Sequence, residues 1–200
     1  KFFKVKNLII TDDNSFNQAK KINQKKRFNL FNNYENFQKI FKNKNDYIMS
    51  SITGLEGLKP TLNSIKFTKN ILIANKEAII CGWSLIEKEM LNHNTKFIPV
   101  DSEHFSIWYG LKNFKNNNLE KVILTASGGP FYKTSINNFK KIKVSDALKH
   151  PNWSMGKKIS TDSATMINKV FEVMEARKVF DIEYQKIKIL IHPKSYIHAI

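Results

Sequence analysis

The sequence predicts an α/β fold that is built around parallel strands. In its first half, short apolar segments alternate with segments of helical length, which is the pattern of βαβ units. The polar run Asp101-Ser102-Glu103 directly follows one of the predicted strands, where a parallel sheet usually places its ligand sites. Hydrophobic residues make up 42% of the chain, which permits a packed core and argues against global disorder.

The first hundred residues contain most of the predicted strands. A strand is predicted at 4–11, around Leu8-Ile9-Ile10, and one or two partly solvated amphipathic helices at 14–41, a stretch rich in Lys and Asn. The next elements are a strand at 46–51, a helix that Gly54 and Gly57 open and that runs to about Phe67, a strand at 70–75, a helix at 76–91 and a strand at 96–100. We expect Gly54 and Gly57 to serve helix–strand packing, because they do not complete a dinucleotide fingerprint.

The sequence changes in texture after Val100, and we place a domain boundary near Asp101, with domains at 1–100 and 101–200. The second domain is predicted to contain a strand at 121–125, a glycine-rich loop at 126–130, loops through 150–153, a helix at 161–179 and a strand at 187–191. The chain lacks an initial Met and stops within the apolar stretch 189–200, so we expect it to be part of a longer protein.

Composition limits the classes of function. The net charge of +16 comes almost entirely from lysine, because Arg27 and Arg177 are the only arginines, and arginine is the usual residue for bidentate contacts with bases. We attribute the charge mainly to the codon usage of an AT-rich genome, with an anionic substrate as a further reason, and keep a nucleic-acid-binding module as the alternative. No apolar run is long enough to cross a bilayer, and no targeting signal opens the chain.

The triplet Asp101-Ser102-Glu103 is a candidate metal site. Two carboxylates one residue apart at the end of a parallel strand can converge on a hard cation such as Mg²⁺ or Mn²⁺. The triplet alone is a weak signal, because most such triplets are solvated or cap a helix.

The predicted helix at 161–179 carries a second polar set. At about 100° per residue, one face is apolar and the opposite face is polar. The apolar set is Met166, Val170, Val173 and Met174, and the polar set is Asn168, Glu172 and Glu175, with Lys169 on its flank. Asp162 or Ser163 suits the N-cap, so the helix start can receive an anion, with Asn168 and Lys169 as further donors. A solvated polar face is equally compatible with this periodicity.

Other segments give weaker signals. The loop at 125–131 lets backbone approach a ligand, although Gly-Gly-Pro is more often a simple turn. Trp153, in the loop at 150–156, is either a core anchor or a lid over a ligand, and its chemistry alone favours the anchor. We expect structural roles for His192 and His198, and a core position for Cys81, the single cysteine.

Six segments occur in the following order: 72–77 (LIANKE), 99–104 (PVDSEH), 127–131 (SGGPF), 150–159 (HPNWSMGKKI), 162–169 (DSATMINK) and 191–195 (IHPKS). Together they closely resemble the signature segments of the 1-deoxy-D-xylulose 5-phosphate reductoisomerase family. The resemblance extends from about Asp46 to the end, whereas residues 1–45 carry little family signal.

The resemblance implies a role for each matching position. Asp101, Glu103 and Glu172 match the divalent-metal ligands of the family, and Lys76, Ser102 and Glu103 match residues around the reacting end of the substrate. The phosphate-binding set is matched by Ser127, Ser163, Asn168 and Lys169, with His150 close by, and positions that contact NADPH are matched by Asn75, Glu77 and Gly156. Trp153 and Met155 lie on what resembles a flexible lid, and the catalytic candidates are Lys76, Glu103, His150 and Trp153.

The resemblance also implies a fold and an activity. Residues 1–100 resemble the C-terminal part of a Rossmann-like NADPH-binding domain, and residues 101–200 resemble most of an α/β catalytic domain. The implied reaction uses NADPH and Mg²⁺ or Mn²⁺, with Co²⁺ as a substitute, to isomerise and reduce 1-deoxy-D-xylulose 5-phosphate to 2-C-methyl-D-erythritol 4-phosphate for isoprenoid precursors. The implied setting is a homodimer in the bacterial cytoplasm or a plastid-type organelle, with a small sugar phosphate as partner and neither nucleic acid nor membrane.

Two departures from the family pattern matter. The glycine-rich dinucleotide motif would precede Lys1 and a helical region would follow Ile200, so we expect residues 1–200 alone to be inactive, and an inactive fragment stays a further alternative. Ile167 and Val170-Phe171 replace residues that are commonly Met and Gly-Leu, and we expect them on or near the packed side of their helix.

Overall fold

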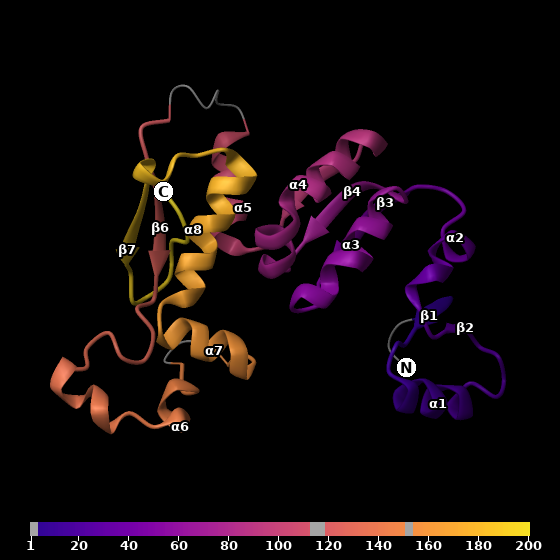
Figure 1. The fold of residues 1–200 in the computed structure, drawn as a ribbon, viewed down its shortest axis with the longest axis horizontal. Helices are drawn as coiled ribbons and strands as arrows, with labels where there is room; N and C mark the ends of the chain where they lie inside the picture. The colour runs from indigo at the N-terminus through magenta and orange to yellow at the C-terminus, as the bar shows by residue number, and fades with distance from the viewer. Residues whose placement is uncertain (1–3, 113–118, 151–153) are drawn as a thin grey trace.

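The computed structural model describes residues 4–112, 119–150 and 154–200. Its strands form three small sheets, β1-β2, β3-β4-β5 and β6-β7, and every pairing between these strands is parallel. In Figure 1 the three groups follow one another from the indigo N-terminal part, through the magenta middle, to the orange and yellow C-terminal part. The predicted α/β class with parallel strands is confirmed.

The N-terminal group differs in part from the prediction. β1 (Asn7–Ile9) and β2 (Asn29–Phe31) pair in parallel, and α1 (Asp13–Ile22) joins them, with the side chain of Asp12 accepting a 2.8 Å hydrogen bond from the Ser15 amide as its N-cap. The short 3₁₀ turn η1 (Tyr34–Asn36) and α2 (Phe37–Ile40) follow. A purely helical reading of 14–41 is therefore wrong at β2, because a three-residue strand is too short to show an alternation of its own.

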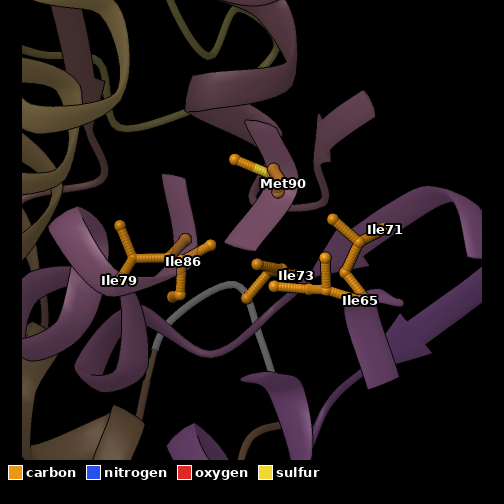
Figure 2. Packing of buried hydrophobic residues seen from close by; sticks show 6 residues of the cluster. All are labelled: Ile65, Ile71, Ile73, Ile79, Ile86 and Met90. Atoms are coloured by element: carbon orange, nitrogen blue, oxygen red, sulfur yellow. The ribbon is translucent and has the colours of Figure 1, made fainter. Parts of the chain in front are cut away.

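The middle sheet has the order β3-β4-β5, with strands at Asn45–Ser50, Thr68–Ile73 and Lys96–Pro99. The turn η2 (Leu55–Gly57) and α3 (Leu58–Ile65) join the first two strands, and α4 (Lys76–His93) joins the last two. Their shared core is a cluster of buried side chains, shown in Figure 2: Ile65, Ile71, Ile73, Ile79, Ile86 and Met90. Burial of one such side chain contributes roughly 1.5–3 kcal/mol, so this cluster fixes the strand ends that carry the site.

Cys81 is exposed, so its predicted core position is wrong. α4 buries Ala78, Ile79, Ile86 and Met90, which share one face at helical spacing, and Cys81 falls outside that face.

The C-terminal group is built on the parallel pair β6 (Val122–Ala126) and β7 (Ile187–Ile191). α5 (Ser102–Leu111), which was not predicted, follows β5 directly, and the predicted boundary near Asp101 falls at that junction. Between the two strands lie η4 (Ile136–Lys141), α6 (Val144–Ala147), α7 (Lys157–Ala164), α8 (Ile167–Phe180) and η5 (Tyr184–Lys186). Their core is Ile107, Val122, Leu124, Ala176, Ile182 and Ile187.

Residues 161–179 form parts of two helices and not one. α7 ends at Ala164, where the Thr165 hydroxyl donates to the Thr161 carbonyl at 3.1 Å, and α8 starts after Met166, whose φ of 62° lies in the left-handed region. The predicted N-cap at Asp162 or Ser163 is wrong, because both residues lie inside α7 and the cap of α8 is Met166. Neither Gly nor Pro marks the break, so the sequence does not reveal it.

The burial of α8 also differs from the prediction at several positions. Ile167 and Val170 are 41% and 47% exposed, while Lys169, Glu172 and Glu175 are buried. The expectation that Ile167 and Val170 lie on the packed side is therefore wrong. The polar face is buried because it meets charged groups of α4 and α5, described below.

Within the described residues, no helix is both long enough and apolar enough to span a membrane.

Candidate active site

A cavity of about 770 Å³ lies where the carboxyl ends of β4, β5 and β6 approach α7 and α8. Every predicted site residue that the structure describes lines it: Asn75, Lys76, Glu77, Asp101, Ser102, Glu103, Ser127, His150, Gly156, Ser163, Asn168, Lys169 and Glu172. Met155 of the predicted lid lines it too, whereas Trp153 lies outside the described residues. Ligand sites at the carboxyl ends of parallel strands are the rule in α/β folds.

Three carboxylates converge in this cavity. Asp101 follows β5 and caps α5, accepting a 3.1 Å hydrogen bond from the Glu103 amide, and Glu103 itself lies in the first turn of α5. Glu172 comes from α8 and is 1% exposed. One oxygen from each of the three residues lies within 4.8 Å of the other two. The structure thus places the predicted metal ligands around one point, where a single cation can reach all three.

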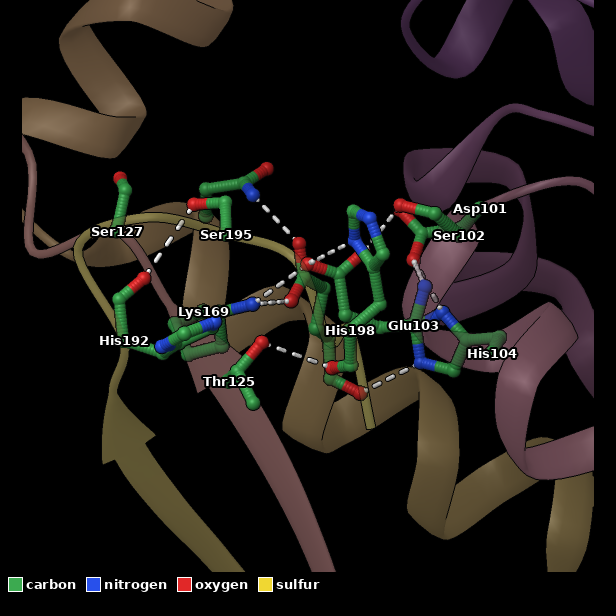
Figure 3. Close-up of polar contacts among 12 residues, drawn as sticks. Asp101, Ser102, Glu103, His104, Thr125, Ser127, Lys169, His192, Ser195 and His198 are labelled. Atoms are coloured by element: carbon green, nitrogen blue, oxygen red, sulfur yellow. Dashed lines mark hydrogen bonds and ion pairs between the residues drawn. The ribbon is translucent and has the colours of Figure 1, made fainter. Parts of the chain in front are cut away.

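Two lysines neutralise part of this charge. Lys76, the first residue of α4, forms an ion pair with Asp101, and its Nζ lies 3.6 Å from Oε1 of Glu172. The Nζ of Lys169 lies 3.0 Å from Oε1 of Glu103 and also pairs with Glu172, as Figure 3 shows for Lys169 and Glu103. Burial raises the pKa of Glu103, but the charge of Lys169 and hydrogen bonds from Ser102 and Lys169 outweigh it, so the pKa lies below its usual value. Glu103 is therefore ionised at neutral pH.

Three of the predicted phosphate ligands lie on or near the junction of α7 and α8. Ser163 is in the last turn of α7, and Asn168 and Lys169 are in the first turn of α8. The Nδ2 of Asn168 donates to Oε1 of Glu172 at 2.6 Å. These three side chains gather beside the carboxylates at the start of α8, a position that suits an anion, and this place is called the candidate anion-binding corner.

The glycine-rich loop after β6 brings Ser127 to the same corner. A side-chain carbon at Gly129 would lie 2.6 Å from the carbonyl oxygen of Ser163, so only glycine permits this approach of the loop to α7. The Ser127 hydroxyl lies 3.1 Å from Nε2 of His150. Burial lowers the pKa of His150, which favours the neutral imidazole at neutral pH.

Two of the predicted cofactor contacts, Asn75 and Glu77, lie where α4 begins, and the third, Gly156, caps α7. The Oδ1 of Asn75 caps α4 by accepting from the Ala78 amide at 3.0 Å, and its Nδ2 donates to the carbonyls of Ile52 and, at 2.7 Å, of Gly54. Both donor hydrogens and one acceptor position of the Asn75 amide group are thus used within the chain. Gly57 allows this packing, because a side chain there would collide with the amide of Asn75.

Glu77 and Gly156 are linked through Lys158. The Nζ of Lys158 lies 2.7 Å from a carboxylate oxygen of both Glu77 and Asp162, and Gly156 caps the helix that carries Lys158. Burial alone would raise the pKa of Glu77, but the hydrogen bond and charge of Lys158 lower it below its usual value. The same contacts, with that to Asp162 largest, raise the pKa of Lys158. This contact joins the start of α4 to α7 across the cavity.

Ser195 and His198 are among the cavity residues that the sequence did not mark as site residues. The segment after β7 turns back beside β6, where the Thr125 amide donates to the His198 carbonyl at 3.1 Å, and the Nδ1 of His198 comes to 3.8 Å from Oε1 of Glu103. His198 therefore lines the cavity, whereas a purely structural role was expected for it. His192 does have a structural contact, since its Nε2 accepts from the Tyr196 amide at 3.0 Å. Ser195 and His198 follow β7, which is parallel to β6, and this position beyond the end of a strand could have marked them as site residues.

Comparisons with known proteins agree with this arrangement. Residues 1–82 match the 1-deoxy-D-xylulose 5-phosphate reductoisomerase family, and residues 97–180 match its C-terminal domain. The chain is 59% identical over 202 residues to 1-deoxy-D-xylulose 5-phosphate reductoisomerase from Pelagibacter ubique, covering 100% of this chain and 52% of that protein. It is 49% identical over 156 residues to the enzyme of Macrococcus caseolyticus, covering 78% and 42% of the two chains.

Solved structures give the same result. A crystal structure of DOX-P reductoisomerase in complex with NADPH, fosmidomycin and magnesium superimposes with a TM-score of 0.86 at 33% identity, covering 98% of this chain and 51% of that chain. The enzyme from Zymomonas mobilis in complex with NADPH gives 0.85 at 34% identity, covering 97% and 50%. The chain spans about half the length of these relatives. Its fold and sequence place it in the 1-deoxy-D-xylulose 5-phosphate reductoisomerase family.

Proposed function

We propose that the full-length protein that contains this chain converts 1-deoxy-D-xylulose 5-phosphate to 2-C-methyl-D-erythritol 4-phosphate, using NADPH and a divalent metal. The observation that carries the proposal is the convergence of Asp101, Glu103 and Glu172 in one cavity, beside an anion-binding corner. Family membership and the structures of relatives with NADPH and magnesium support it.

The carboxylate set suits a hard divalent cation. Three carboxylates whose oxygens lie within 4.8 Å offer the ligands that Mg²⁺ and Mn²⁺ prefer, and Co²⁺ can substitute. When bound, such an ion supplies Lewis-acid polarisation of substrate oxygens. The side chains of this chain provide the rest: Asp101 and Glu103 are set by the start of α5, and Glu172 by α8.

The anion-binding corner suits the substrate phosphate. We assign the phosphate to Ser127, Ser163, Asn168 and Lys169, with His150 beside them. Lys169 pairs here with Glu103 and Glu172, and its ammonium group becomes available to phosphate once those carboxylates hold a cation. Lys76 and Ser102 lie at the carboxylates and are assigned to the reacting end of the substrate. A neutral His150 can exchange a proton or a hydrogen bond with the hydroxyl of Ser127.

We assign the nicotinamide cofactor, which supplies the hydride, to the side of the cavity formed by Asn75, Glu77 and Gly156. Because both donor hydrogens and one acceptor position of the Asn75 amide group are used within the chain, its contact with NADPH would come through backbone atoms or the remaining acceptor position. Glu77 and its partner Lys158 bridge the two sides of the cavity at this point. We also propose Trp153 as part of the lid that excludes water from the site.

Two further properties belong to this proposal. We propose that the full-length protein is a homodimer and acts in the cytoplasm of a bacterium, since relatives such as those of Pelagibacter and Clostridium are bacterial enzymes. Neither alternative from the sequence, a nucleic-acid-binding module or an inactive fragment, gains support from the comparisons.

The test is oxidation of NADPH by the full-length protein with 1-deoxy-D-xylulose 5-phosphate and Mn²⁺, with the product identified by mass. Glu172→Gln keeps the shape of the side chain and removes its charge, so it should lower kcat/KM by more than about tenfold, as loss of a metal ligand does. Glu120→Gln, at a side chain that is 88% exposed, is the matched control and should retain activity. Full activity in Glu172→Gln, or absence of product in the unaltered protein, contradicts the proposal.

A further inference from the structure

His104 is buried directly behind the carboxylate set. It is 0% exposed, and its Nδ1 lies 3.0 Å from Oδ1 of Asp101 while its Nε2 lies 2.9 Å from the backbone carbonyl oxygen of Glu172. Its ring also stacks on Phe180 at a centroid distance of 6.3 Å. One imidazole thus connects two of the three proposed metal ligands, which come from the start of α5 and from α8 (Figure 3 labels His104 and Asp101).

The two nitrogens of His104 have different partners. A carbonyl oxygen only accepts hydrogen bonds, so Nε2 carries the hydrogen and donates to the Glu172 carbonyl. Nδ1 faces carboxyl oxygens, Oδ1 of Asp101 and, at 3.5 Å, Oε2 of Glu175, so a hydrogen bond at this edge requires a second proton, on Nδ1 or on a carboxyl group. The contacts of the two nitrogens fix both the orientation of the ring and the position of Asp101.

Glu175 is an unusual residue to bury at this place. It lies one turn beyond Glu172, is 1% exposed, and its Oε2 has no hydrogen-bond partner within the described part of the chain. Burial raises its pKa above the usual value, with the charge of His104 acting in the opposite direction. A buried carboxyl group costs stability unless it is paired or hydrogen-bonded, and the residue that faces Glu175 is His104, whose Nδ1 lies 3.5 Å from Oε2.

Neither residue is among those that line the cavity, so neither reaches a ligand there. We propose that His104 and Glu175 are positioning residues for the metal site: His104 holds the Asp101 carboxylate toward the cation and ties it to α8, and Glu175 holds the imidazole in place. This inference rests on the proposed function, because it assumes that Asp101 binds a divalent metal.

The test is direct Mn²⁺ binding to the full-length, metal-stripped protein, measured from the EPR signal of free Mn²⁺. In His104→Gln the amide nitrogen replaces Nε2 and keeps the tie to Glu172, but the contact with Asp101 is lost. In His104→Asn the amide nitrogen replaces Nδ1 and can keep the contact with Asp101. We expect His104→Gln to bind Mn²⁺ about 10- to 100-fold more weakly, as is typical for residues that orient metal ligands, and His104→Asn to bind it more tightly than His104→Gln.

A double-mutant cycle tests the role of Glu175. Glu175→Leu should weaken Mn²⁺ binding in the unaltered background and have little further effect beside His104→Gln, because both changes release the same imidazole. His93→Gln, on α4 and paired with Glu89 at the surface, is the matched histidine control and should leave Mn²⁺ binding unchanged.

Thermal unfolding in EDTA separates positioning from simple support of the fold. Equal Mn²⁺ affinities for the Asn and Gln variants, accompanied by equal losses of thermal stability, would mean a structural role and overturn the proposal. Unchanged Mn²⁺ affinity in His104→Gln would overturn it as well. Failure of the unaltered protein to bind Mn²⁺ would instead refute the proposed function on which it rests.

Discussion

Replacement of Lys169 tests most directly the proposed phosphate contact of this residue and its ion pairs with the carboxylates. Lys169 is 5% exposed, and its ammonium group pairs with Glu103 at 3.0 Å and with Glu172. Lys169→Met keeps most of the apolar stem and removes the charge, so the change is confined to the ion pairs and to the proposed phosphate contact.

The expected loss of kcat/KM follows from the phosphate contact. A hydrogen bond to a charged group contributes about 1.5–3 kcal/mol, which corresponds to a decrease of about 10- to 150-fold in kcat/KM, mainly through KM. Without metal, the variant should also be less stable by about 3–5 kcal/mol, because Glu103 and Glu172 remain buried without their shared cation. Added Mn²⁺ should restore more stability to the variant than to the unaltered protein, because it supplies that missing charge.

The assay is steady-state NADPH oxidation with substrate and saturating Mn²⁺, beside thermal unfolding with EDTA or Mn²⁺. Lys178→Met, an exposed lysine on the same helix, is the control for loss of one positive charge and should change neither measurement. An unchanged kcat/KM in Lys169→Met would refute the phosphate role. A metal-free stability equal to that of the unaltered protein would show that the ion pairs contribute nothing to the fold.

Three further predictions concern the core, the ion pair between Lys158 and Glu77, and the lid. Ile86→Ala, at a side chain that is 0% exposed, should lower the free energy of unfolding by about 2–5 kcal/mol in urea titrations, and a loss below about 1 kcal/mol would contradict the assigned core. Lys158 lowers the pKa of Glu77 in the folded protein. The pair therefore stabilises the protein at pH values above the pKa that a glutamate has in the unfolded chain, and this stabilisation is lost as the pH falls through the lower pKa of the folded state. Lys158→Met should therefore cost at most about 1 kcal/mol at pH 7, since Lys158 is 56% exposed, and less near pH 4; a cost that grows with acidity would reverse the assigned sign. Trp153, two residues before the cavity residue Met155, should change its fluorescence when a substrate analogue binds the full-length protein, and constant emission with binding confirmed calorimetrically would count against the lid.

Local sequence was sufficient to predict those strands and helices whose periodicity and composition are set within a few residues. The alternation of apolar strands with helices between 45 and 99 predicted the middle sheet, because buried parallel strands and the helices between them differ in both length and spacing. The run Asp101-Ser102-Glu103 after a strand marked the edge of the sheet at which the cavity lies. The assignment of individual site residues depended on family resemblance, since the residue types alone left a solvated face equally open.

Tertiary structure decided which face of α8 is buried. A helical period shows that two faces differ, but the buried face is the one whose partners compensate its desolvation. Lys76 of α4, together with Glu103 and His104 of α5, supplies those partners from distant parts of the sequence, so the polar face turns inward and Val170 remains at the surface. The His104–Glu175 contact was hidden for the same reason, because the two residues approach one another only after the chain has folded.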